Sequence, residues 1–172
     1  MNLQANDFEL FGLDAQVAQD RTAIDARWKA LQREAHPDRF AAQGDAAQRL
    51  AMQWSVRINE AYQRLKDPMR RAAYLCELRG APIDAERNTA MPTAFLMHQL
   101  EWREALEEAK VAADAREILA QVHSLRQQML QRCEQLLDQD NDPAAAAVEV
   151  RGLMFVQRFA REVDARLEQL ET

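Results

Sequence analysis

The tripeptide His36-Pro37-Asp38 places an imidazole and a carboxylate on either side of a proline, so it is the first place where this sequence could do chemistry. A histidine and an aspartate can act together as general acid and base. No third catalytic group or oxyanion donor is evident beside them, so an enzyme is only one hypothesis. The simpler alternative is a turn that ends a helix, because a proline disfavours the helical conformation for the residue before it.

The stretch before this tripeptide has the pattern of an amphipathic helix over residues 22–35. Apolar side chains recur on one narrow stripe, at Ile24, Trp28, Leu31 and Ala35. Lys29 and Arg33 fall on the opposite face. The sequence therefore predicts a helix with a basic exposed side, which ends at His36.

Further helices are predicted on the other side of the motif. After an expected loop at 36–44, a long helix begins near Asp45, and Asp67-Pro68 then starts a short helix over 68–78. The apolar stripe of the long helix is Leu50, Trp54, Ile58, Ala61, Tyr62 and Leu65. The motif would thus lie between two long helices, with a small opening helix or turn around Phe8 to Leu13 packed on the pair.

The composition favours an all-α protein. The 172 residues include only 4 Gly and 5 Pro, and strong helix formers are abundant. No apolar run approaches the roughly 20 residues that a membrane span needs, and no secretory signal is visible. The two cysteines, Cys76 and Cys133, form neither a disulfide framework nor a metal motif, so a reducing compartment is expected. We expect a cytoplasmic protein.

The net charge of −6 is unevenly distributed. Residues 1–80 carry 12 Lys and Arg against 11 Asp and Glu, whereas residues 81–172 carry 10 against 17. The basic helix before His36 raises the alternative of a DNA-binding protein. The balanced charge of the first half and the acidity of the second argue against any nucleic-acid partner.

The surroundings of the tripeptide resemble a J-domain, the module that stimulates the ATPase of DnaK-class chaperones. The resemblance covers residues 5–76 and rests on four landmarks in order: Asp7-Phe8-x-Leu10-Phe11-Gly12-Leu13, then Leu31 to Phe40 with His36-Pro37-Asp38, then Ile58-Asn59-Glu60-Ala61-Tyr62, then Arg71-x-x-Tyr74. It implies that His36, Pro37 and Asp38 dock on the chaperone. It also implies that Lys29 and Arg33, flanked by Arg27 and Arg39, meet an acidic chaperone surface.

A linker is predicted at 79–92, where Gly80 and Pro82 interrupt the helical pattern. The predicted organisation is a first domain at 1–78 and a second at 93–172. The second domain is expected to be a three-helix bundle, with helices over about 94–110, 114–138 and 144–170.

The first helix of this bundle has two apolar faces. Its core face comprises Phe95, Trp102, Leu106 and Ala109. A second cluster lies nearly opposite, at Leu96, Met97 and Leu100, and the carboxylates Glu101, Glu104, Glu107 and Glu108 surround it. One hypothesis is a docking surface for a basic partner. The alternative is that this cluster packs under the linker or against the first domain.

The run Thr93-Ala94-Phe95-Leu96-Met97-x-Gln99-Leu100-Glu101-x-Arg103-Glu104, placed after a J-domain, resembles the HscB family of iron–sulfur co-chaperones. The resemblance implies that the second domain holds the scaffold protein IscU and presents it to the chaperone HscA. The matching scaffold-contact positions are Leu96, Met97, Leu100, Glu101, Glu104, Glu108 and Phe155. Phe155 is assigned by this resemblance alone.

We expect no catalytic residue, metal site or cofactor in this protein. His98 and His123 have no ligand-type neighbours at metal-binding spacing, two cysteines are too few to hold an iron–sulfur cluster, and no phosphate loop is present. The remaining alternative is a J-protein with an unrelated client, such as a general holder of unfolded proteins.

Overall fold

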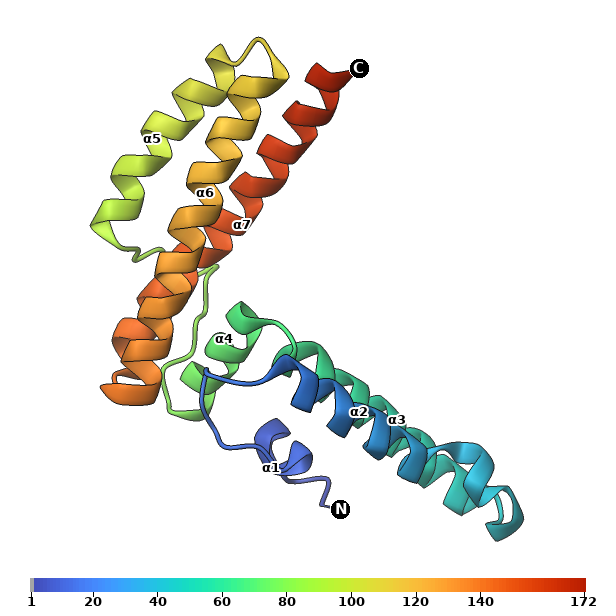
Figure 1. Ribbon diagram of the computed structural model, residues 1–172. Helices are drawn as coiled ribbons and strands as arrows, with labels where there is room; N and C mark the ends of the chain where they lie inside the picture. Colours follow the sequence, from blue (N-terminus) through green and yellow to red (C-terminus); the bar gives the residue numbers. More distant parts are fainter. Residues whose placement is uncertain (1) are drawn as a thin grey trace. The chain divides into compact units, whose positions relative to one another are not determined.

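The computed structural model describes residues 2–172, so the first residue of the predicted 1–78 domain lies outside it. Within this range the regular structure is entirely helical, with seven α-helices, one 3-10 helix and one π-helical turn (Figure 1). The predicted all-α fold class is confirmed. The chain divides into two compact units between Leu75 and Cys76. The predicted limits of the linker and of the second domain stay predictions.

The first unit is built on the antiparallel pair α2 and α3, which lie side by side in Figure 1. The elements in this part of the chain are α1 (Asp7–Phe11), α2 (Arg21–Ala35), the 3-10 helix η1 (Pro37–Gln43), α3 (Asp45–Leu65) and α4 (Pro68–Leu78). The bounds of α2 and α4 and the start of α3 agree with the predicted ones to within a residue, whereas α1 ends two residues before Leu13. The expected loop at 36–44 is wrong, because most of it forms η1, which packs on α3.

The buried stripes of α2 and α3 explain why the two helices pair. The buried members are Ile24, Leu31 and Ala35 on α2, and Ala51, Trp54, Ile58, Ala61 and Leu65 on α3. Leu50 was expected in this core and is instead exposed, with Ala51 buried in its place. The start of α3 packs against η1 as well as α2. The side of α3 that is buried there therefore includes Ala51 and not Leu50.

A buried carboxylate fixes α1 on α3. The side chain of Asp7 is fully buried and accepts hydrogen bonds from Arg57 Nη1 at 2.8 Å and from Arg64 Nε at 2.6 Å. The backbone N–H of Asp7 donates to the hydroxyl of Tyr74 at 3.0 Å. A buried charge is tolerated only when it is paired and hydrogen-bonded, and here two guanidinium groups meet that need.

The second unit is a bundle of α5 (Thr93–Glu108), α6 (Ala112–Glu134) and α7 (Pro143–Glu171), as expected. A π-helical turn, Gln135–Gln139, extends α6 before the chain reverses. The long helices α6 and α7 form the main contact, and the shorter α5 packs on both (Figure 1).

The segment predicted as a linker is held against α7 by a buried arginine. Arg151 donates to the carbonyl of Ile83 at 3.0 Å and to that of Ala90 at 2.9 Å. Pro92 also approaches α7 closely: a Cβ added at Gly152 would lie 3.2 Å from Pro92 Cδ. The start of α5 is therefore fixed in place by the chain that precedes it.

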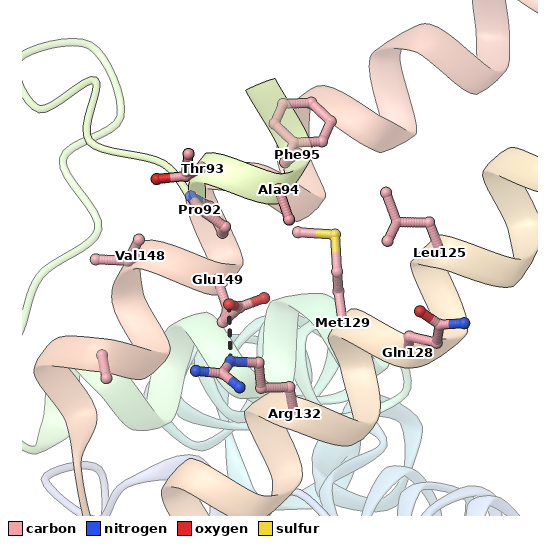
Figure 2. A pocket seen from close by; sticks show the side chains of 11 residues that line it. Pro92, Thr93, Ala94, Phe95, Leu125, Gln128, Met129, Arg132, Val148 and Glu149 are labelled. Carbon is pink, nitrogen blue, oxygen red and sulfur yellow. Dashed lines mark ion pairs between the residues drawn. The ribbon is translucent and has the colours of Figure 1, made fainter. Parts of the chain in front are cut away.

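Glu149 is a second buried carboxylate, on the face of α7 that lies beneath the start of α5. Its Oε1 lies 3.0 Å from Nε of Arg132, whose own side chain is mostly exposed (Figure 2). Burial raises the pKa of the Glu149 carboxyl, and the interaction with Arg132 offsets this only in part.

Replacing Asp7 by Asn should lower the free energy of unfolding by about 2–4 kcal/mol, because two guanidinium groups lose a buried anion but can still partly hydrate. Urea unfolding at neutral pH measures this loss. The exposed Glu34→Gln change is the matched control and should leave stability unchanged. A stability of Asp7→Asn equal to that of the control would contradict this role.

The raised pKa of Glu149 predicts the sign of a pH effect. The folded protein holds this proton more tightly than the unfolded chain, so the contribution to stability is present at low pH and is lost as the pH rises from 4.5 through the raised pKa. Thermal unfolding should show wild type losing stability relative to Glu149→Gln over this interval. Glu168→Gln, an exposed change on α7, should track wild type. Parallel curves for wild type and Glu149→Gln would contradict the prediction.

Candidate functional site

The His36-Pro37-Asp38 tripeptide lies at the exposed end of the α2–α3 pair. α2 ends at Ala35, His36 is extended, and Pro37 opens η1. The Nδ1 atom of His36 accepts a hydrogen bond from the backbone N–H of Asp38 at 3.2 Å. The His36 and Asp38 side chains are 58% and 91% exposed, so both are available to a partner.

The basic side of α2 continues from the tripeptide. Lys29 and Arg33 are exposed one turn apart, and Arg39 Nη1 donates to the carbonyl of Arg33 at 3.2 Å. Gln32, Arg33, His36 and Arg39 line a shallow surface hollow. The structure thus brings together the predicted residues of α2 and the start of η1.

Arg27 has a different position. Its Nε donates to the carbonyl of Phe11 at 2.9 Å, so this side chain holds the end of α1 on α2. Its predicted contact with a chaperone stays a prediction.

A polar seam that sequence reasoning did not identify fixes the spacing of α2 and α3. The amide oxygen of Asn59 accepts from Trp28 Nε1 at 2.9 Å and from Gln32 Nε2 at 2.7 Å. The Trp28 ring stacks on Tyr62 with 4.5 Å between ring centroids. Tyr62 was expected on the apolar stripe of this helix, whereas the contact of Asn59 with α2 is seen only in the fold. They position the helix that presents His36.

On α5 the second apolar cluster faces solvent. Leu96, Met97 and Leu100 are 47%, 66% and 70% exposed, while Phe95 and Trp102 on the other face are buried. Glu101, Glu104 and Glu108 are exposed around the cluster. We call Leu96, Met97 and Leu100 the apolar patch. Among the described residues it is not sealed inside the bundle, contrary to the alternative of packing under the linker.

Phe155 lies on α7, next to α5. It is half-buried, and its ring centroid lies 6.3 Å from that of Phe95, the neighbour of Leu96 in sequence. The guanidinium carbon of Arg158 lies over this ring, at 4.5 Å from its centroid. The structure therefore places Phe155 beside the helix that carries the apolar patch.

A cavity of about 510 Å³ opens beneath the first turn of α5, and no sequence signal predicted it. Figure 2 shows its walls, with Phe95 and Ala94 from α5, Met129 and Leu125 from α6, and Glu149 from α7. The Glu149–Arg132 pair is the charged part of this lining. Pro92 reaches the cavity from the segment before α5.

The two thiols are poorly suited to chemistry. Burial raises the pKa of Cys76 to about 11 and that of Cys133 to about 12, so both stay protonated at neutral pH. Across residues 2–172, no group of three or more His, Cys, Asp or Glu side chains is arranged to hold a metal ion. In the same range, every helix is too short or too polar to cross a membrane.

This chain is similar to known proteins over its whole length. Residues 91–164 match the family model described as the HSCB C-terminal oligomerisation domain. Proteins from Burkholderia multivorans and Burkholderia cenocepacia, both named co-chaperone protein HscB homolog, are each 51% identical over 100% of this chain and 99% of their own.

Solved structures show the same fold. HscB from Vibrio cholerae superposes with a TM-score of 0.83 at 35% identity, covering 96% of this chain and 99% of that chain. Human HscB gives a TM-score of 0.89 at 23% identity, over 100% of this chain and 86% of that chain, which is a likeness of fold alone. The family is one of co-chaperones and not of enzymes, so the hypothesis of a His36–Asp38 catalyst is wrong. This chain belongs to the HscB co-chaperone family.

Proposed function

We propose that this protein couples an iron–sulfur scaffold of the IscU type to a DnaK-class chaperone of the HscA type. One unit stimulates the chaperone's ATPase through His36-Pro37-Asp38, and the other binds the scaffold on α5. The observation that carries the proposal is the exposure of the apolar patch on a helix whose opposite face already packs in the core. Delivery of the scaffold should promote transfer of its cluster to acceptor proteins.

The contact between the first unit and the chaperone would depend on charge and on the fixed shape of the turn at His36. Lys29, Arg33 and Arg39 present positive charge around the exposed His36 side chain, which suits an acidic surface on the chaperone. Charge complementarity of this kind adds association rate and orientation more than affinity. The turn itself is rigid, because Pro37 fixes the backbone and Asp38 is tied to His36. A rigid turn loses little conformational entropy when it docks.

The second contact is apolar, with a charged edge. Burying the parts of Leu96, Met97 and Leu100 that are still exposed yields about 3–5 kcal/mol before costs. Association costs about 4–15 kcal/mol, so this surface alone binds weakly. Glu101, Glu104 and Glu108 add attraction for basic side chains of the scaffold.

Weak contacts suffice because the two units belong to one chain. Once the first unit is bound to the chaperone, the scaffold held by the second is present at a high effective concentration. The chaperone then closes on its client as ATP is hydrolysed. A J-protein with an unrelated client would bind unfolded proteins as well as the folded scaffold, and a competition experiment between the two distinguishes these functions.

Changing His36 to Gln should reduce stimulation of the HscA ATPase by about tenfold or more, which corresponds to about 1.4 kcal/mol or more of activation free energy. Steady-state ATPase at increasing co-chaperone concentration measures it. His123→Gln, an exposed change on α6, should retain full stimulation. Since His36 is exposed, its loss should not alter thermal stability. Full stimulation by His36→Gln would contradict the assignment of this turn.

Replacing both Leu96 and Leu100 by Ala should raise the Kd for IscU by about tenfold to a hundredfold, or about 1.4–2.8 kcal/mol. Isothermal titration of full-length proteins measures the change. Basal ATPase stimulation without scaffold should be unaffected, because the turn at His36 is intact. Val111→Ala removes an exposed apolar side chain of the same unit and should leave the affinity unchanged. An unchanged Kd in the double variant would contradict the proposal that the apolar patch binds the scaffold.

A further inference from the structure

A small hollow beside the apolar patch carries positive charge, although the second half of the chain is acidic. It lies between α5 and α7 and includes Arg103 and Arg158 together with the aromatic rings of Phe155 and Phe159. Arg158 lies 4.5 Å from the centroid of Phe155, and Arg103 lies 5.8 Å from that of Phe159. Rings of this kind hold a guanidinium in place by cation–π attraction and leave its N–H edge free to bind.

The two arginines differ in how their charge is balanced. Arg103 Nη1 lies 3.3 Å from Glu162 Oε2, so that pair is close to neutral. Arg158 is exposed, and within residues 2–172 no carboxylate lies within ion-pair distance of it. Its guanidinium lies over the Phe155 ring. The net charge of the hollow is therefore positive, and Arg158 supplies it.

The hollow lies on one side of the apolar patch, so the two sides of the patch differ in charge. With about 100° per residue, Arg103 lies about 60° from Leu100 in one direction around α5. In the other direction Glu104 lies about 40°, Glu108 about 80° and Glu101 about 100° from Leu100, while Glu107 lies about 20° from Leu100 on the Arg103 side. Three of the four carboxylates thus lie on one side of the apolar patch, and on the other side the surface continues past Glu107 and Arg103 into the hollow on α7.

We infer that Arg158 binds a carboxylate of the docked scaffold and thereby fixes the orientation in which the scaffold lies on the apolar patch. This inference rests on the proposed function and adds a specificity-determining residue to it. The planar guanidinium can donate two parallel hydrogen bonds to a carboxylate, and Phe155 holds it in place for that geometry. A partner with only basic groups could bind the glutamates in more than one orientation. A partner that carries both a basic group and a carboxylate can satisfy the glutamates and Arg158 together in one orientation only.

The test is the affinity of full-length variants for IscU, measured as a function of salt. Arg158→Gln should raise the Kd by about threefold to fivefold and make its salt dependence shallower. Arg158→Glu should raise the Kd by about tenfold, through slower association. Arg158→Lys keeps the charge and should fall between wild type and Arg158→Gln. Arg161→Gln, an exposed arginine one turn further along α7, is the matched control and should behave as wild type.

The salt dependence separates binding from packing. If Arg158 only packed on Phe155, its loss could change the Kd but would leave the salt slope unaltered. Substituting the scaffold's Asp and Glu residues one at a time should identify one variant whose affinity no longer responds to Arg158→Gln. An unchanged Kd and salt slope in Arg158→Glu would overturn the inference. If the Leu96/Leu100 variant still loses affinity in that case, the proposed function stands without it.

Discussion

The arrangement of the second unit depends on how α5 is anchored. Trp102 stacks on Phe159 at 5.7 Å between ring centroids and donates to Gln121 Oε1 at 3.2 Å, so one face of the helix is committed to α6 and α7. A helix that packs by one face on a two-helix layer has no neighbour for the other. The exposure of Leu96, Met97 and Leu100 follows from that geometry, and burial of these side chains needs a partner.

In the first unit, too, the residues that hold the helices together differ from the residues that are exposed around His36. Trp28, Asn59 and Tyr62 hold α2 against α3, and they do so without using the side of α2 that carries Lys29 and Arg33. The helix pair therefore acts as a support, and the surface that we propose to bind the chaperone is confined to its exposed side and end. Each unit thus separates the residues that stabilise it from the residues that we propose to bind.

The helices and the exposed faces of α2 and α5 could be predicted from periodicity, whereas the roles proposed for the residues on them come from family resemblance. Helices α2 to α7 follow from apolar stripes and from prolines near their ends, and the second face of α5 was visible as apolar side chains that a core does not need. Phe155 could not be found this way, because its exposure depends on where α5 crosses α7. Asp7, Glu149 and Arg151 were also missed: a charge becomes a buried anchor only through partners distant in sequence, and no local pattern encodes those.

The central claim is that one chain must hold both partners. Its most direct test is the scaffold-dependent ATPase of HscA with an equimolar mixture of two defective variants, His36→Gln and the Leu96→Ala, Leu100→Ala double variant. If delivery requires both surfaces on one molecule, the mixture stays far below wild type at the same total concentration. Restoration of wild-type activity by the mixture would show that the two surfaces act independently, and would contradict the account.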